Sequence, residues 1–296
     1  MLREFREVYQ YHSKSTERFA NHEVHNAYEK AIRDLKNYGF TGIEGKRVLD
    51  LGCGQRYPFA LQCTADGADV TALDVTYIQP SSLPVAVFQM VRHDGPKRAI
   101  KSLFRRIMFD KKYYDTLESI TGKPMRSYRS KIRFMTADPT SSSYDLPSAS
   151  FDLIASNAVL EHVSDVPGFA AETARLLDSG GYFHAIIHNY YSISGGHNLE
   201  WANPDEKPSP KVPPWDHLRQ NLYPEWLYLN HYKPEQYKSA FEKHFQVLRF
   251  EGVGIHHDPN QPEGEKYLTG KVAADLAAYP RDLLLTRLWS MICKKV

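Results

Sequence analysis

The stretch Val48-Leu49-Asp50-Leu51-Gly52-Cys53-Gly54 decides the fold of this 296-residue chain. An apolar run ends in an acidic residue and continues into two glycines one residue apart, which is typical of a buried strand that turns sharply beneath a small ligand. Glycine lets the main chain approach such a ligand closely. The same turn opens dinucleotide-binding units, but their fingerprint requires a third glycine at position 57, where this chain has Tyr57. A nicotinamide or flavin cofactor is therefore disfavoured.

A second acidic residue ends the next predicted strand. This strand covers residues 68–74, and its last residue, Asp74, lies 20 positions beyond Gly54. In nucleotide-binding α/β units an acid at this place accepts hydrogen bonds from both ribose hydroxyls. A tight turn followed by a strand-end acid, with no ligand, is the alternative interpretation.

Strands and helices then alternate along the chain, which predicts an α/β fold with a parallel sheet. The last segment, 282–295, is predicted as an antiparallel edge strand, although its Leu-rich start is also compatible with a helix. The other expected elements are helices at 59–66, 170–177, 233–245 and about 268–278, and strands at 47–51, 68–74, 132–136, 151–156, 182–188 and 246–250.

The order of these features resembles the class I S-adenosylmethionine methyltransferase superfamily. The resemblance covers roughly residues 45–190 and includes the Asp50–Gly54 turn, Asp74 and the run Asn157–Val163, in which a helix is expected to begin at Glu161-His162. It implies a Rossmann-like doubly wound α/β fold with a seven-stranded, mostly parallel sheet, an antiparallel edge strand, a helical insertion and a lid. It also implies methyl transfer, with S-adenosylmethionine as the cofactor.

The resemblance assigns a protein group to each part of the cofactor. Asp50 is expected to face the ammonium, Asp74 the ribose hydroxyls and Asp138 the adenine amino group. The N-terminus of the helix that starts near Pro58 offers free N–H groups to the carboxylate. The expected cofactor-binding residues are Asp50, Gly52, Cys53, Gly54, Asp74, Val75, Ala137, Asp138, Ser156 and Asn157.

Two long insertions interrupt this pattern. We expect an N-terminal helical cap at 1–40 and a cofactor-binding domain at 41–296, with insertions at 80–130 and 189–232. Helical spacing over 98–114 places apolar residues on one face and basic residues on the other. This basic face is either a solvated surface or an attachment site for an acidic or phosphate-bearing ligand.

The second insertion carries histidines among prolines and aromatic residues, which is typical of a lid or binding element. We predict His217, His197 and His162 as candidate general bases, because alkyl transfer to a hydroxyl requires a proton acceptor. His162 is equally compatible with a structural role. His197, His217 and His231 with Asp216 lack the tight spacing of metal ligands, so no metal is predicted.

The composition is that of an ordinary globular protein. Lysine and arginine number 37 against 35 acidic residues, a net charge of +2, so neither nucleic acid nor an anionic membrane is indicated as a partner. Three cysteines without a CxxC motif favour a reducing compartment, and no run approaches the roughly 18 apolar residues of a membrane span. We therefore expect a cytoplasmic protein that binds a small-molecule substrate, with its oligomeric state open.

These observations favour a methyltransferase that acts on a hydroxyl oxygen of a small molecule. The Gly-Gly-His and Trp-Asp-His segments of the lid resemble bacterial methyltransferases of glycan or secondary-metabolite pathways, which implies a sugar or secondary metabolite as the acceptor. Methylation of nitrogen or carbon, and a non-catalytic cofactor-binding module, are the alternatives. The chain lacks, after its fourth strand, the Asn/Asp-Pro-Pro-aromatic motif of amino methyltransferases that act on flipped bases.

Overall fold

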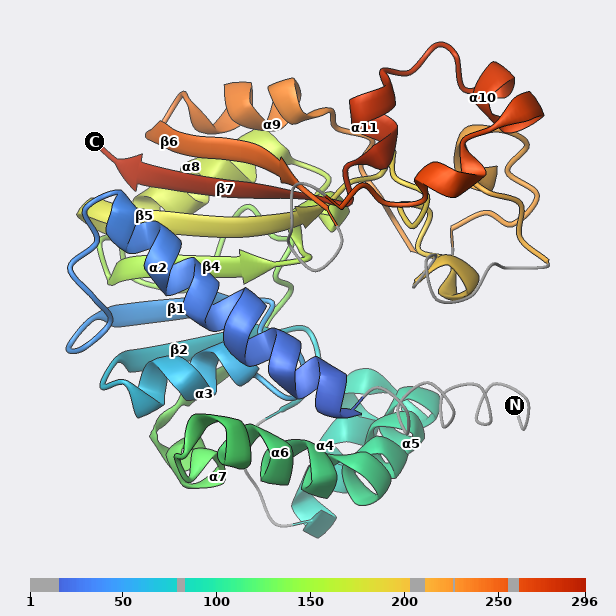
Figure 1. Ribbon diagram of the computed structural model, residues 1–296. Helices are drawn as coiled ribbons and strands as arrows, with labels where there is room; N and C mark the ends of the chain where they lie inside the picture. The colour runs from blue at the N-terminus through green and yellow to red at the C-terminus, as the bar shows by residue number, and fades with distance from the viewer. Residues whose placement is uncertain (1–15, 79–82, 203–210, 226, 255–260) are drawn as a thin grey trace. The chain divides into compact units, whose positions relative to one another are not determined.

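The computed structural model describes residues 16–78, 83–202, 211–225, 227–254 and 261–296. A seven-stranded sheet has the order β3-β2-β1-β4-β5-β7-β6 (Figure 1). β1 pairs in parallel with β2 and β2 with β3, whereas β7 runs antiparallel to β5 and to β6. The expected doubly wound α/β fold is confirmed. The strands are β1 (Arg47–Leu51), β2 (Asp69–Asp74), β3 (Arg133–Thr136), β4 (Phe151–Asn157), β5 (Leu177–His188), β6 (Phe245–Val253) and β7 (Leu288–Lys295).

The C-terminal strand departs from its expected place. The prediction puts it at the sheet edge, but β7 lies between β5 and β6, and β6 forms the edge. Burial explains the difference, because residues 290–293 of β7 are buried, as in a strand with neighbours on both sides, whereas most of β6 is half-exposed. The Leu-rich start of the segment is the helix α11 (Arg281–Leu285). A helix and a strand therefore share residues 282–295.

The chain forms two compact units. The first comprises Met1–Pro139 with Phe151–Ala155, and the second comprises Thr140–Ser150 with Ser156–Val296. The predicted boundary at residue 40 lies within the first unit, and residues 1–15 of the predicted cap lie outside the described residues. No helix within the described ranges is long and apolar enough to cross a lipid bilayer.

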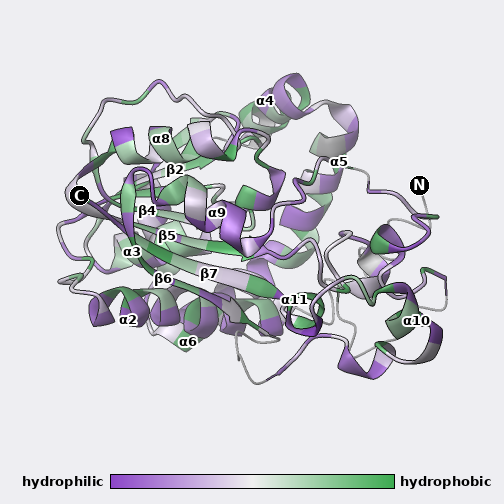
Figure 2. Ribbon diagram, turned by 90° about the horizontal axis from the view of Figure 1, so that it is seen from above, coloured by the Kyte–Doolittle hydropathy of each residue, from purple (hydrophilic) through white to green (hydrophobic). Residues whose placement is uncertain are grey.

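In the first unit, the N-terminal helical segment packs on the crossover helix α3 (Pro58–Ala65). The segment contains a π-helical stretch, η1 (Glu23–Glu29), and then α2 (Lys30–Asn37), in which hydrophilic and hydrophobic residues alternate (Figure 2). The rings of Tyr28 and Phe59 meet edge to face, with centroids 5.5 Å apart. Pro58 occupies the first turn of α3. N–H groups in this turn have no acceptor within the helix, so the N–H that proline lacks is not needed there.

The first insertion is helical, as expected, but its predicted burial is wrong in part. Ile100, Ile107 and Met108 are exposed, whereas Ser102 is buried and Arg105 is half-buried. The reason is that this part of the insertion turns polar side chains toward a cavity of the first unit, described below. The insertion comprises α4 (Leu83–Asp94), α5 (Pro96–Arg105), η2 (Arg106–Asp110), α6 (Lys111–Thr121), α7 (Met125–Tyr128) and η3 (Arg129–Lys131).

In the second unit, α8 (Val166–Leu176) contacts β5, and α9 (Pro234–Phe241) contacts β6 (Figure 1). The rings of Phe183 and Phe241 stack with centroids 5.1 Å apart, which joins β5 to α9. The helix expected to begin at Glu161-His162 is instead one 3-10 turn, η4 (Leu160–His162). α8 begins only after Asp165, whose carboxylate accepts a hydrogen bond from the Gly168 amide at 2.9 Å. This acid is a favourable N-cap, so it sets the start of the helix.

The described part of the second insertion is ordered around a hydrophobic core. Trp215 is fully buried, and its Nε1–H donates to the Tyr191 carbonyl at 3.0 Å. Figure 1 shows this yellow and orange chain beside α11 and α10 (Gly270–Asp275), the latter shorter than the expected helix. The core consists of Ile193, Trp201, Val212, Trp215, Leu268, Leu276, Leu284 and Leu285.

Candidate functional site

The predicted cofactor turn and Asp74 meet in the first unit. The amides of Gly52 and Cys53 donate to the Leu73 carbonyl at 2.8 and 3.1 Å, which joins the turn to β2. The Gly54 amide donates to one carboxylate oxygen of Asp74 at 2.9 Å, and the Thr76 amide donates to the other at 2.8 Å. Each carboxylate oxygen keeps a second lone pair for a ligand hydroxyl. Asp74 therefore both holds the glycine turn and remains able to bind a diol.

Tyr57, which replaces the third glycine of a dinucleotide fingerprint, takes a glycine-like conformation. Its φ of 39° lies in the left-handed region, as do the φ of 79° at Gly52 and 67° at Gly54. Its buried ring packs edge-on against Phe134, with centroids 4.9 Å apart. Packing of the ring thus stabilises a strained backbone that lets α3 begin at the next residue.

Asp50 is almost completely buried beneath the turn. Its carboxylate accepts a hydrogen bond from the Ala60 amide, in the first turn of α3, at 3.1 Å. Burial, reinforced by the charge of Asp74, raises the pKa of Asp50 to about 7. A cationic ligand at this point would therefore stabilise the ionised carboxylate.

The other expected cofactor residues of the first unit lie at strand ends. Cys53 is a buried free thiol whose pKa burial raises well above its usual range, so it is not a nucleophile. Val75 and Asp138 are exposed, and the Ala137 amide donates to the Asp74 carbonyl at 3.1 Å. These residues are accessible or positioned by the backbone, and their contacts with the cofactor stay predictions.

The remaining two expected residues, Ser156 and Asn157, belong to the second unit, at the end of β4. Ser156 is buried, and its hydroxyl lacks a hydrogen-bond partner among the described residues. Asn157 is exposed. An unpaired buried hydroxyl is costly, which supports a ligand at this strand end.

A cavity of about 230 Å³ lies in the first unit beside Gln55 and Thr76. Basic side chains of the first insertion line it, together with one carboxylate, Asp110. The Nε–H of Arg129 is buried without a hydrogen-bond acceptor among the described residues, and the Nε of Arg105 lies 3.5 Å from the Asp110 carboxylate in an ion pair. Guanidinium groups in this state are suited to bind a carboxylate or a phosphate. The cationic lining consists of Arg105, Arg106, Lys111, Arg126 and Arg129.

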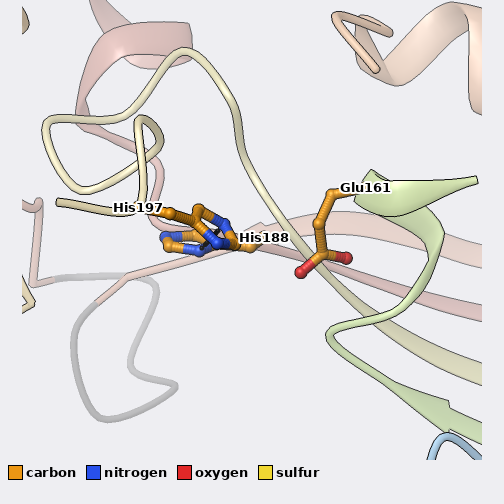
Figure 3. A group of neighbouring side chains, drawn as sticks. All are labelled: Glu161, His188 and His197. Atoms are coloured by element: carbon orange, nitrogen blue, oxygen red, sulfur yellow. Dashed lines mark hydrogen bonds between the residues drawn. The ribbon is translucent and has the colours of Figure 1, made fainter. Parts of the chain in front are cut away.

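In the second unit, three side chains converge from segments far apart in sequence (Figure 3). Glu161 lies in the turn after β4, His188 ends β5, and His197 lies in the following loop. Nδ1 of His188 and Nε2 of His197 are 2.9 Å apart, and the three residues offer ligand atoms that all lie within 4.8 Å of one another. Figure 3 shows the Glu161 carboxylate directed toward the two imidazoles.

Burial shifts the proton equilibria of this group. It raises the pKa of Glu161 to about 8, lowers that of His197 to about 4, and lowers that of His188 well below its usual range. Both imidazoles are therefore neutral at pH 7, the form that accepts a proton or binds a metal.

His162 is a fourth member of this group. Its Nδ1 lies 3.0 Å from the Tyr228 carbonyl oxygen, which can only accept, so Nδ1 carries the proton of the neutral ring. Nε2 is then a free lone pair and lies 4.0 Å from a Glu161 oxygen. The rings of His162 and His197 meet edge to face with centroids 5.2 Å apart. We call Glu161, His162, His188 and His197 the histidine cluster.

The structure gives the other lid histidines different surroundings. The Nε2–H of His217 donates to the Tyr190 carbonyl at 2.8 Å, and the ring is buried. His231 stacks on the Tyr190 ring with centroids 3.8 Å apart, and Asp216 accepts a hydrogen bond from the Tyr223 amide. Two of the predicted bases, His162 and His197, therefore lie together, whereas the His217 ring is buried and hydrogen-bonded to the Tyr190 carbonyl.

Neither Glu161 nor His188 was predicted as a site residue. A signal for His188 was present, because it ends a predicted strand and, in open α/β sheets, ligands bind beyond the carboxyl ends of strands. No spacing rule connects it to Glu161, 27 residues earlier.

Comparison with known proteins agrees with this fold. The chain matches the methyltransferase domain family over residues 21–247, and no curated protein matches it. A solved S-adenosylmethionine-dependent methyltransferase from Mesorhizobium loti is 18% identical, with 90% of this chain and 98% of that chain covered and a TM-score of 0.47. A geranyl diphosphate C-methyltransferase from Streptomyces coelicolor, solved with Mg²⁺, geranyl diphosphate and S-adenosyl-L-homocysteine, is 13% identical, with coverages of 90% and 78% and a TM-score of 0.47.

The family match covers most of the chain and includes the glycine turn, Asp74 and the histidine-bearing end of β5. The chain therefore belongs to the methyltransferase domain family and is a class I methyltransferase that uses S-adenosylmethionine.

Proposed function

We propose that this protein transfers the methyl group of S-adenosylmethionine to a hydroxyl oxygen of a small molecule, such as a sugar or a secondary metabolite. The observation that carries the proposal is the histidine cluster, which gathers neutral imidazoles at the carboxyl end of β5. A hydroxyl is a weak nucleophile, so its methylation gains most from a nearby proton acceptor.

The reaction requires little of the protein beyond positioning and proton removal. The acceptor oxygen attacks the methyl carbon in line with the S–CH₃ bond, the new O–CH₃ bond forms as that bond breaks, and S-adenosylhomocysteine leaves. The hydroxyl proton passes to an imidazole. The products are a methyl ether and a protonated histidine, which later releases its proton to water.

His162 is the base we favour among the three predicted histidines. Its Nδ1 is fixed by the Tyr228 carbonyl, so its Nε2 is available as an acceptor. Nε2 of His197 already faces His188, and Nε2 of His217 is bound to the Tyr190 carbonyl. His197 and His217 then position the cluster.

For the cofactor, we propose that Asp74 binds the ribose hydroxyls and that Asp50 faces the ammonium. The support is that Asp74 retains free lone pairs after holding Gly54 and Thr76, and that a cation would favour the ionised form of the buried Asp50. The other expected cofactor residues remain part of the same proposal.

The test is an acceptor screen with S-adenosylmethionine that carries a ¹³C-labelled methyl group. Sugars and phenolic metabolites are incubated with the full chain, and products are analysed by mass spectrometry and by the carbon chemical shift of the new methyl group. A methoxy shift is the expected result. Methyl groups on nitrogen or carbon would contradict oxygen as the acceptor atom, and cofactor binding without product from any acceptor would favour a non-catalytic module.

A further inference from the structure

We propose that Glu161, His188 and His197 form a binding site for one divalent transition-metal ion of the zinc class. All three residues belong to the second unit, so the site is complete within one compact part of the chain. The sequence predicted no metal because the lid histidines show no ligand spacing. The structure brings together a different set, of which only His197 was considered.

The ligand atoms are already close to the separation that an ion requires. Metal–nitrogen bonds of about 2.0–2.1 Å place tetrahedral ligand atoms about 3.3 Å apart. Nδ1 of His188 and Nε2 of His197 are 2.9 Å apart, and all three ligand atoms lie within 4.8 Å of one another (Figure 3). Small side-chain movements would therefore suffice for an ion to replace the proton that the two imidazoles share.

The buried carboxylate of Glu161 points to a missing partner. The residue is 1% exposed, and neither side-chain oxygen accepts a hydrogen bond of normal geometry from the described residues, although backbone N–H groups of Glu161 and His188 lie near enough to lower its pKa in part. The nearest histidine that would neutralise it, His162, leaves Nε2 at 4.0 Å from the carboxylate. A buried carboxyl group without well-placed hydrogen-bond partners is costly, and a cation coordinated at this point would remove that cost and favour the ionised form.

A series of hydrogen bonds fixes the orientation of the His188 ring. Residues behind a metal ligand commonly orient it in this way. Nε2 of His188 lies 2.8 Å from the Ser194 hydroxyl, which donates to the Glu263 carboxylate at 2.8 Å. Glu263 is fully buried and is paired with Arg287. Because the Ser194 proton is directed to Glu263, the His188 Nε2 carries its own proton, and its Nδ1 lone pair faces the site.

The loop that carries His197 is fixed by close packing. His197 has a left-handed φ of 55°. A Cβ at Gly195 would lie 2.0 Å from the Tyr190 carbonyl oxygen, and a Cβ at Gly196 would lie 2.8 Å from the His217 ring. Only glycine fits at these two places. The chain therefore maintains a strained backbone that delivers one imidazole to this point, as functional sites do.

The donor set determines the class of ion. Two imidazoles and one carboxylate suit Zn²⁺, Fe²⁺, Co²⁺ or Mn²⁺, whereas Mg²⁺ and Ca²⁺ prefer oxygen ligands alone. Three protein ligands leave at least one coordination position open, which is typical of catalytic rather than structural zinc sites.

A role for the ion in catalysis rests on the proposed function. An acceptor hydroxyl at the open position would be held in place, and its pKa would fall, which eases the loss of its proton to His162. Binding of the ion itself does not depend on that function.

The test is a titration of the full chain, stripped with a chelator and dialysed, with Co²⁺ as an optical probe. The visible absorption of Co²⁺ reports imidazole and carboxylate ligands, and Zn²⁺ is then added as a competitor. The variants are Glu161→Gln, which keeps the side-chain volume, His188→Gln, His197→Gln and the outer-shell variant Ser194→Ala. His25→Gln, an exposed histidine of the first unit, is the matched control.

We expect the wild type and His25→Gln to bind one Co²⁺ per chain, which Zn²⁺ displaces. Ser194→Ala should weaken binding by about 10–100-fold, the usual effect of an outer-shell residue, and each ligand variant should weaken it further. The proposed metal site would be overturned if the wild type showed no Co²⁺ absorption spectrum. It would also be overturned if the ligand variants bound Co²⁺ as tightly as the wild type does. Calorimetric binding of S-adenosylhomocysteine serves as the check that each variant is folded.

The outcome is separable from that of the proposed function. Co²⁺ binding without methyl transfer to any hydroxyl would retain the metal site and contradict oxygen methylation. Methyl transfer to oxygen that survives both the chelator and Glu161→Gln would support oxygen methylation and contradict a catalytic role for the ion, whereas the Co²⁺ titration alone decides whether the ion binds.

Discussion

The cofactor turn of the first unit and the histidine cluster of the second differ in how their polar groups are satisfied. Asp74 accepts hydrogen bonds from the amides of Gly54 and Thr76, and Asp50 accepts one from Ala60, so the turn is complete without a ligand. In the cluster, the buried Glu161 accepts none of normal geometry from the described residues. The difference indicates a preformed cofactor site and a second site whose buried carboxyl group lacks a well-placed partner that a ligand could supply.

The largest expected effect tests the catalytic half of this comparison. His162→Ala should lower kcat by about 10²–10⁴-fold, because general-base assistance contributes this much. His217→Ala, which removes a buried ring bound to the Tyr190 carbonyl, should affect stability more than kcat. Steady-state kinetics and thermal unfolding of both variants check this. A larger loss of kcat in His217→Ala, at unchanged stability, would transfer the role of base to His217.

The next effect tests the cofactor half. Asp74→Ala should weaken S-adenosylmethionine binding by about 1.5–3 kcal/mol, the range for hydrogen bonds to a charged group. Part of this loss comes from release of the Gly54 amide, which Asp74 holds at 2.9 Å. Calorimetric titration measures it, with Asp69→Ala as the control, since Asp69 is exposed at the start of the same strand. Unchanged affinity in Asp74→Ala would remove Asp74 from the ribose site.

The buried Asp50 predicts a pH dependence of stability in the absence of cofactor. Its pKa is about 7 in the folded chain and near 3.8 when unfolded, so between these values only the folded state holds the proton. The free energy of unfolding should therefore fall as pH rises from about 4 to 7, by at most about 1.4 kcal/mol per pH unit from this group. Asp50→Asn should remove that component from denaturant unfolding curves. If the free energy of unfolding changed with pH in the same way in the wild type and in Asp50→Asn, the pKa of Asp50 would not be raised in the folded chain, and the prediction would be wrong.

The smallest expected effect separates the two interpretations of the basic insertion. If the cavity binds anions, Arg129→Ala should weaken inorganic pyrophosphate binding by about 1 kcal/mol, which is about fivefold in Kd. Lys36→Ala, an exposed cation of α2, is the control. Fluorescence or calorimetric titration measures both. Equal affinities in the two variants would support a basic face that is only solvated.

The cofactor turn was predictable because its geometry is local. Asp50 and Asp74 lie in the last two residues of neighbouring parallel strands in which Leu51 pairs with Leu73, so the spacing of one strand-turn-helix unit brings them together. The histidine cluster was not predictable as a set. Its position depends on a 3-10 turn where a helix was expected and on a Gly195-Gly196 turn packed against Tyr190. Neither feature produces a periodic signal.

Burial was also hard to predict where no regular pattern exists. His217 was selected by residue type in an irregular segment, yet its ring is buried beside Gly196. In the basic helix the periodicity was correct, but Ile100 and Ile107 face solvent because Arg105 lines the cavity. Residue type alone did not distinguish a ligand-facing arginine from a solvated one.

The most direct test of the central claim is one calorimetric titration series with S-adenosylhomocysteine, applied to wild type, Asp74→Ala and Glu161→Gln, with NAD as the control ligand. We expect that the wild type and Glu161→Gln bind the product alike, that Asp74→Ala binds it at least about tenfold more weakly, and that none binds NAD. Equal binding by Asp74→Ala, or binding of NAD by the wild type, would contradict this claim.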